Sequence, residues 1–140
     1  MSAKLTYDSI NVGDTLPLLE LPPLSRTTLA LYAGASGDHN PMHIDTDFAR
    51  AAGMPDVFAH GMLSAAWLAR LLSNWVPQTA IRSLDVRFAA LTQVGERIRC
   101  TGTVDEKFEH EGRRSVRLKI ATANADGGIK LSGEALVAWP

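Results

Sequence analysis

Residues 61–76, GMLSAAWLARLLSNWV, constrain the fold more than any other part of this sequence. Large apolar side chains recur on one side at helical spacing, and alanines line another side. The large set is Leu63, Trp67, Leu71, Leu72 and Trp75, and the small set is Ala65, Ala66 and Ala69. A helix that is apolar on two sides is embedded in protein rather than lying on its surface. We therefore expect a long central helix that Pro77 ends.

The pattern changes after residue 77, where apolar and polar residues alternate with a period of two. The apolar positions are Leu84, Val86, Phe88 and Ala90, then Ile98, Cys100, Gly102 and Val104, then Val116, Leu118 and Ile120, and finally Ile129, Leu131, Ala135 and Val137. Glu111-Gly112 and Gly127-Gly128 are typical of hairpin turns between such runs. With an N-terminal strand at 15–21, these runs predict an antiparallel sheet with one apolar face. The predicted fold class is α+β, with the sheet wrapped around the long helix.

Composition limits what such a chain does. Its 140 residues are enough for one domain, spanning 1–140, with a single core. A net charge of −1 offers no basic surface for nucleic acid, and no apolar run reaches the roughly 18 residues of a membrane helix. The N-terminus lacks a signal-peptide core, and the one cysteine, Cys100, favours a reducing compartment. We expect a cytoplasmic protein without nucleic-acid or membrane partners.

Two short helices are expected before the long one. Ser25 is a suitable N-cap for a helix over 26–36, and Gly37 is placed to end it. Asp45 is expected to cap a second helix, TDFARAA, that Gly53 stops. The polar segment GDHNPMHID lies between these helices and is the first candidate functional site.

Pro41 decides how that polar segment is shaped. Proline lacks an amide donor and disfavours helix at Asn40, so residues 38–43 are expected to form a turn. His39 and His43 have the spacing of two metal ligands on one helix, but Pro41 breaks the helix that would align them. A metal site is therefore disfavoured, and a local capping turn or an acid–base pair is left.

The acid–base interpretation assigns Asp38 and His43 to opposite sides of one water molecule. An imidazole titrates near pH ~6.5, so it both takes and gives a proton at working pH. A positioned pair of this kind contributes about 10²–10⁴ in rate. Asn40 would hydrogen-bond the backbone of the turn and hold the pair in register. In the alternative interpretation, Asp38 and Asn40 only satisfy local amides and His43 is exposed.

A second candidate lies at the start of the long helix, in FAHGML. Amides at a helix N-terminus carry positive potential, and Gly61 lets a ligand come close to that backbone. A carbonyl bound there would have its developing negative charge stabilised. Gly61 alone is also compatible with a flexible helix entry, and His60 either touches substrate or satisfies the loop.

Together the two segments resemble the signature of the MaoC-like (R)-specific enoyl-thioester hydratases and dehydratases, which have the hot-dog fold. The family pattern is roughly G-D-x-N-P-x-H-x-D followed by H-G-M-L. The matching positions are Asp38, Asn40, Pro41, His43 and Asp45, then His60, Gly61, Met62 and Leu63. INVGD near the start and VRFAALTQVGERI in the predicted sheet extend the resemblance over nearly the whole chain.

The resemblance implies reversible addition of water to a trans-2-enoyl thioester, giving an (R)-3-hydroxyacyl thioester. Asp38 and His43 would hold and activate the water, and the Gly61 amide would bind the thioester carbonyl. Asn40, His60 and Met62 are the expected substrate-binding residues. No metal or cofactor is implied, because CoA or an acyl carrier protein is part of the substrate.

Other interpretations stay open beside this one. The chain would also fit the catalytic subunit of a heteromeric dehydratase, a hot-dog acyl thioesterase, or a lipid-binding protein without catalysis. A homodimer or higher homo-oligomer is expected, because the long strands leave a sheet edge to cover. Leu91 replaces a proline that many family members carry, and Ala69 replaces a helix serine of some short-chain hydratases. Because of the second departure, the acyl-chain preference of those hydratases is not carried over to this sequence.

Overall fold

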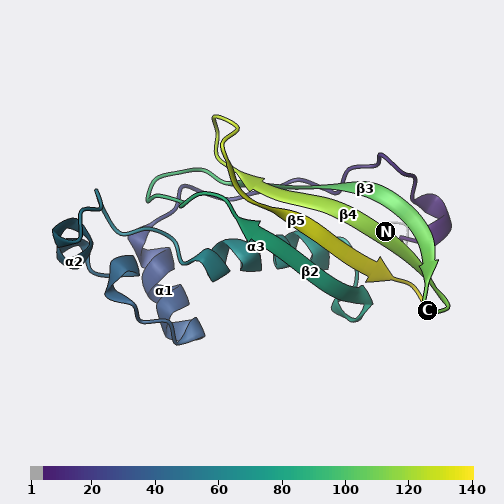
Figure 1. Cartoon of the computed structure of the whole chain (residues 1–140), viewed down its shortest axis with the longest axis horizontal. Helices are drawn as coiled ribbons and strands as arrows, with labels where there is room; N and C mark the ends of the chain where they lie inside the picture. The colour runs from purple at the N-terminus through teal and green to yellow at the C-terminus, as the bar shows by residue number, and fades with distance from the viewer. Residues whose placement is uncertain (1–4) are drawn as a thin grey trace.

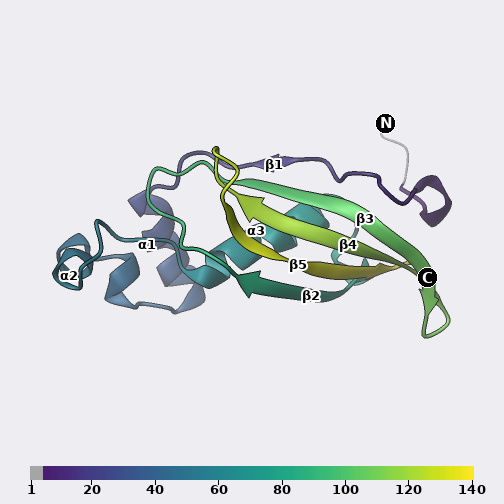
Figure 2. The same ribbon diagram turned by 45° about the horizontal axis from the view of Figure 1, so that its top comes forward.

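The computed structural model describes residues 5–140, which form an antiparallel sheet curved around one long helix (Figure 1). The five strands lie in the order β1-β3-β4-β5-β2. They are β1 (Leu19–Glu20), β2 (Ile81–Phe88), β3 (Arg99–His110), β4 (Arg113–Ala123) and β5 (Ile129–Ala138). The helices are α1 (Arg26–Ser36), α2 (Thr46–Ala51) and α3 (Gly61–Ser73), with short 3-10 turns at Tyr7–Ser9, Pro41–His43 and Gln78–Ala80. Helix α3 lies across the concave side of the sheet, and α1 and α2 extend beyond one end of it (Figure 2).

The predicted central helix is present but shorter, since it ends at Ser73 and the chain turns through Asn74 to Val76. Its large apolar side chains pack against the sheet, where Leu68 and Leu72 are fully buried. The prediction that α3 is enclosed on both sides is wrong within one chain, because Ala66 and Arg70 are exposed. The sheet covers one side of the helix and leaves the other open.

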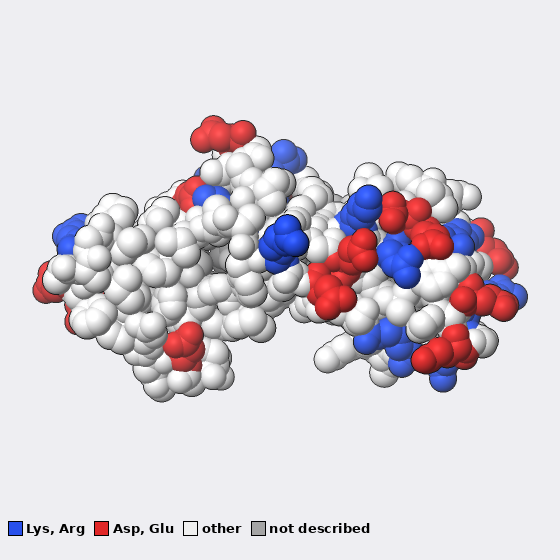
Figure 3. All heavy atoms as spheres, in the orientation of Figure 1, with Lys and Arg blue, Asp and Glu red and all other residues white. Residues whose placement is uncertain are grey.

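The hairpin between β3 and β4 follows the sequence closely. Glu111 and Gly112 both have positive φ, 52° and 75°, the backbone geometry of a tight two-residue hairpin turn. Charged side chains of both signs gather over the strands, whereas the part around α1 and α2 carries few (Figure 3). Several pair across strands, as Arg117 does with Glu134 at 3.9 Å. The outer face of the sheet is therefore the polar one, as the alternation predicts.

Three details of the sheet differ from the sequence prediction. The strand expected at 15–21 shortens to β1, with one further bridge from Thr15 to Thr103. Gly127-Gly128 lies in a longer loop over 124–128, where the Asn124 side chain accepts hydrogen bonds from the amides of Asp126 and Gly128. A register shift in the pairing of β4 with β5 leaves Lys130 without a partner in β4, and there Ile129 is exposed and Lys130 is buried instead.

Local capping positions the helices on either side of the polar turn. Ser25 Oγ accepts a hydrogen bond from the Thr28 amide at 3.1 Å, and Gly37 ends α1 with φ of 77°. Asp45 accepts from the Phe48 amide at 3.1 Å at the start of α2. Both caps are as predicted. None of the helices in residues 5–140 is long and apolar enough to cross a membrane.

Candidate active site

The turn that follows α1 is organised by its own side chains. Asp38 Oδ1 accepts a hydrogen bond from the Asn40 amide at 3.2 Å, and Asn40 Oδ1 accepts from the Met42 amide at 3.1 Å. Pro41 is the first residue of the 3-10 turn that ends at His43. Its fixed φ suits that position, and its missing amide leaves no donor unsatisfied. The sequence thus forms a rigid corner, and Asp38 and His43 lie at its two ends.

His43 has a defined tautomer. Its ring is 9% exposed, and Nδ1 lies 2.8 Å from the main-chain oxygen of Phe58. A carbonyl oxygen only accepts, so Nδ1 must carry the hydrogen. Nε2 of the neutral ring therefore holds a free lone pair, and that atom is able to act as a base.

His60 packs against the turn and contacts both Asp38 and His43. Its side chain is 1% exposed, and Nε2 donates to the main-chain oxygen of Asp38 at 3.1 Å. The ring stacks on His43, with centroids 4.0 Å apart and planes 27° apart, and Tyr32 packs edge-on against it. Burial lowers the pKa of His60 and outweighs the opposing hydrogen bond to Asp38, so His60 is neutral at pH 7. A neutral His60 adds no positive charge beside His43.

The corner brings three polar groups together. One ligating atom from each of Asp38, His43 and His60 lies within 4.8 Å of the others, and Asp38 is exposed while both histidines are buried. Two hydrogen bonds of about 2.8 Å meeting at one water oxygen span about 4.5 Å. One carboxylate oxygen of Asp38 and one ring nitrogen of His43 therefore lie no farther apart than roughly the span of one bridging water molecule. His39 is exposed and lies outside this cluster.

The same cluster is poorly shaped for a metal ion. An imidazole nitrogen binds a metal in the plane of its ring, at about 2.0–2.1 Å for zinc. Two planes 27° apart at a centroid separation of 4.0 Å meet well beyond that distance. His43 and His60 therefore cannot both point a lone pair at one ion in this arrangement.

Gly61 begins α3, and its main chain is accessible to a ligand. His60, the N-cap residue, provides no side-chain cap, and the Leu63 amide returns to the His60 oxygen at 3.1 Å. Within residues 5–140, the amides of Gly61 and Met62 make no hydrogen bond. These free donors sit at the positive end of a 13-residue helix, which favours a developing oxyanion. The Met62 side chain is 63% exposed.

A cavity of about 250 Å³ opens beside the start of α3. Its lining includes Ala59, Gly61, Ser64, Phe88, Thr92 and Leu131. Sequence reasoning missed Thr92, which is 3% exposed and whose Oγ1 has no hydrogen-bond partner among the described residues. Nothing in the local pattern around residue 92 signals this, because the loop is brought to α3 only by the tertiary fold.

A family model described as "MaoC like domain" matches residues 11–125. This chain belongs to the MaoC-like domain family. The predicted family and its hot-dog fold are thereby confirmed. The unliganded (R)-hydratase PhaJ1 from Pseudomonas aeruginosa has a similar structure, with a TM-score of 0.83 at 27% identity, over 96% of this chain and 84% of that chain.

Two curated relatives show the range of proteins that contain this MaoC-like domain. The (R)-specific enoyl-CoA hydratase of Rhodospirillum rubrum is 27% identical over 136 residues, which is 96% of this chain and 91% of that protein. The fatty acid synthase subunit beta of Saccharomyces cerevisiae is 31% identical over 134 residues, 94% of this chain. The chain spans only 6% of that synthase subunit.

The two departures noted in the sequence lie in different places in this MaoC-like domain. Ala69 is half-buried and lines a second hollow of about 470 Å³ with Arg70, Ser73 and Ile81. Leu91 is 48% exposed and lies on the rim of the cavity beside Gly61. Neither residue belongs to the cluster of Asp38, His43 and His60.

Proposed function

We propose that this protein adds water reversibly to trans-2-enoyl thioesters and forms (R)-3-hydroxyacyl thioesters. The observation that carries the proposal is that one Asp38 carboxylate oxygen and one His43 ring nitrogen lie within 4.8 Å of each other. Because His43 Nδ1 is hydrogen-bonded to the Phe58 oxygen, Nε2 is the nitrogen able to act as a base. The unpaired amide of Gly61 supplies the third element that such a reaction needs.

The proposed reaction follows from these groups. A water molecule held between the Asp38 carboxylate and His43 Nε2 gives a proton to this pair as its oxygen bonds to the β-carbon. The electrons of the double bond move toward the thioester carbonyl, whose oxygen becomes negative and is stabilised by the Gly61 amide. The pair then returns a proton to the α-carbon. Two coupled groups titrate as a unit, so the pair as a whole is the acid and base.

The carrier and the assembly are parts of the same proposal. CoA or an acyl carrier protein enters as part of the substrate, and no metal or other cofactor takes part. We expect a homodimer, because Phe88 at the exposed edge strand β2 and Leu91 next to it are 54% and 48% exposed beside the site. A second copy, or a related subunit, would cover them. The buried free thiol of Cys100 is consistent with the cytoplasm.

A panel of enoyl-CoA esters of increasing acyl length tests the function. Hydration removes the conjugated double bond, so its ultraviolet absorbance falls while the thioester survives. Release of free thiol, with the double bond retained in the acid that forms, would instead identify a thioesterase. An inactive purified chain that a related subunit activates would identify a heteromeric dehydratase, and a bound acyl-CoA that stays unchanged for hours would contradict catalysis.

A further inference from the structure

We propose that the Thr92 hydroxyl is a second hydrogen-bond donor to the thioester carbonyl, acting together with the Gly61 amide. This inference rests on the proposed function and adds to it a residue that lies outside the two sequence motifs. The two donors come from different parts of the chain, Gly61 from the start of α3 and Thr92 from the loop between β2 and β3.

The first reason is an unused hydroxyl. Thr92 is 3% exposed, and its Oγ1 makes no hydrogen bond within residues 5–140. A buried hydroxyl without a partner is costly, and native proteins seldom retain one. A ligand oxygen in the adjoining cavity would remove that cost.

The second reason is where the hydroxyl lies. Thr92 lines the same cavity as Gly61, whose amide is also free. The other lining residues are mostly apolar, such as Ala59, Phe88 and Leu131, so few other polar groups would compete for an oxygen bound in this cavity. Donors in such surroundings act more strongly on a developing negative charge than they do in water.

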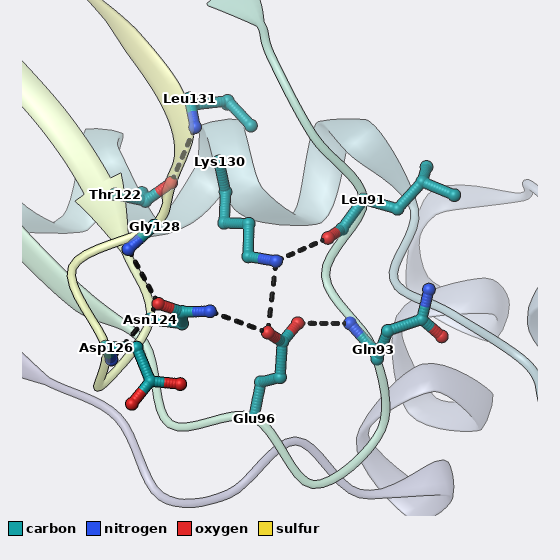
Figure 4. A network of polar contacts seen from close by, with 9 residues as sticks. All are labelled: Leu91, Gln93, Glu96, Thr122, Asn124, Asp126, Gly128, Lys130 and Leu131. Atoms are coloured by element: carbon teal, nitrogen blue, oxygen red, sulfur yellow. Dashed lines mark hydrogen bonds and ion pairs between the residues drawn. The ribbon is translucent and has the colours of Figure 1, made fainter.

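The third reason is that the loop is held in place. The Thr92 main-chain oxygen accepts from the Ala59 amide at 2.9 Å, which fixes residue 92 against the segment leading to Gly61. The residues on either side are also tied down (Figure 4). Lys130 Nζ donates to the Leu91 oxygen at 2.8 Å, and the Gln93 amide donates to Glu96 at 2.6 Å.

An ion pair joins Lys130 and Glu96, the two side chains that hold this loop. Lys130 Nζ lies 3.0 Å from Glu96 Oε1, and Asn124 Nδ2 donates to the same oxygen at 3.0 Å. The two side chains are 11% and 22% exposed. Because this loop is fixed, the Thr92 hydroxyl would lose little conformational entropy on binding the transition state. A hydrogen-bond donor that is already in position is the effective kind for an oxyanion.

Thr92→Val tests the proposal, because valine keeps the shape and removes only the hydroxyl. We expect kcat/KM for enoyl-CoA hydration to fall about 100-fold. The urea midpoint of unfolding should stay the same or rise, because no intramolecular hydrogen bond is lost. Thr92→Ser keeps the hydroxyl and should retain most activity. Thr101→Val, on the exposed face of β3, is the matched control and should behave as the wild type.

A binding measurement separates this proposal from the hydration chemistry. The wild type should bind a saturated acyl-CoA more tightly than the matching S-alkyl-CoA thioether, which has no carbonyl. Thr92→Val should lose most of that preference. The stretching frequency of a ¹³C-labelled thioester carbonyl should be lower when bound to the wild type than when bound to Thr92→Val.

These outcomes decide the inference whatever the catalytic assay gives. If the wild type has no preference for the carbonyl ligand, or if Thr92→Val keeps that preference and the carbonyl frequency, Thr92 is not a donor. If the preference is lost in Thr92→Val but the wild type hydrates no enoyl thioester, the carbonyl site stands and the proposed reaction is wrong.

Discussion

The ring of Phe88 lies against the main chain of Gly61 at the start of α3. A Cβ atom added at Gly61 would come within 3.0 Å of Phe88 Cε1, closer than normal packing tolerates. There is therefore a steric reason for glycine at residue 61, because a side chain there would press against the Phe88 ring.

Gly61→Ala should reduce the hydration rate about 100-fold, because the added methyl group and the displaced Phe88 ring disturb the carbonyl site. Adding Phe88→Ala should recover part of the loss by making room. Gly34→Ala is the matched control, since a Cβ there meets nothing within 4 Å. Steady-state kinetics on all four proteins provide the comparison, and an unimpaired Gly61→Ala enzyme would rule out the steric argument.

Asp38→Asn and His43→Gln should each lower kcat by about two orders of magnitude or more, because each removes one member of the acid–base pair. The double variant should be little worse than either single one, because the two groups act as a unit. Circular dichroism should show a retained fold. Near-full activity of either single variant on a good substrate would refute the assignment.

The stability of the protein should fall when the pH drops below about 6.5. His60 is neutral in the folded state because burial lowers its pKa, whereas in the unfolded chain it titrates near 6.5. Below that pH the unfolded state binds a proton that the folded state does not, so the free energy of unfolding decreases toward the lower folded pKa. His60→Gln should flatten the curve in this range, as measured by urea unfolding at a series of pH values.

A separate loss of stability, caused by Glu96, is expected at lower pH. It serves as the control for the His60 experiment. Burial alone would raise the pKa of Glu96, but hydrogen bonds from Asn124, the Gln93 amide and Lys130 outweigh it and hold that pKa below 4.5. Its stabilisation should therefore be complete above pH 4.5 and decline below it. Glu96→Gln should flatten only this lower range, so identical profiles for the two variants would contradict both assignments.

Cys100 should be unreactive in the folded protein. Burial raises its pKa to about 12, so almost no thiolate is present at pH 8, and the side chain is 0% exposed. A disulfide reagent such as dithionitrobenzoate should release no colour from the native protein and one equivalent of thiolate in urea. Rapid labelling of the native protein would mean that the core around β3 opens readily.

Lys130→Met should destabilise the protein by about 3 kcal/mol, because it leaves the Glu96 carboxylate largely buried without its cation. Lys130→Met combined with Glu96→Gln should recover part of that loss. Lys119→Met is the control, because Lys119 pairs with Asp105 at 3.7 Å on the surface and is 67% exposed. Equal losses for the two lysine variants in urea unfolding would show that burial of the pair does not matter.

Local signals in the sequence were sufficient to predict much of the fold and the closeness of Asp38 and His43. Ser25, Gly37 and Asp45 mark helix ends because caps act over a few residues. Asp38 and His43 are close because one proline-containing turn joins them. Their approach required no knowledge of distant contacts.

Features set by distant contacts could not be predicted in the same way. The burial of Lys130 depends on the register shift between β4 and β5, and on Glu96 from another strand connection. Likewise, the stacking of His60 on His43 and the unpaired hydroxyl of Thr92 arise only when separate segments meet. Alternation and helical spacing predict which residues of one element are buried. They do not predict which other element packs against those residues.

The group that orients His43 is a main-chain oxygen, that of Phe58. An orienting carboxylate would be lost through a single codon change, but every amino acid at residue 58 supplies the same carbonyl. Substitution of residue 58 should therefore leave the tautomer of His43 unchanged. Only a change in the path of the backbone at that residue would alter which ring nitrogen carries the hydrogen.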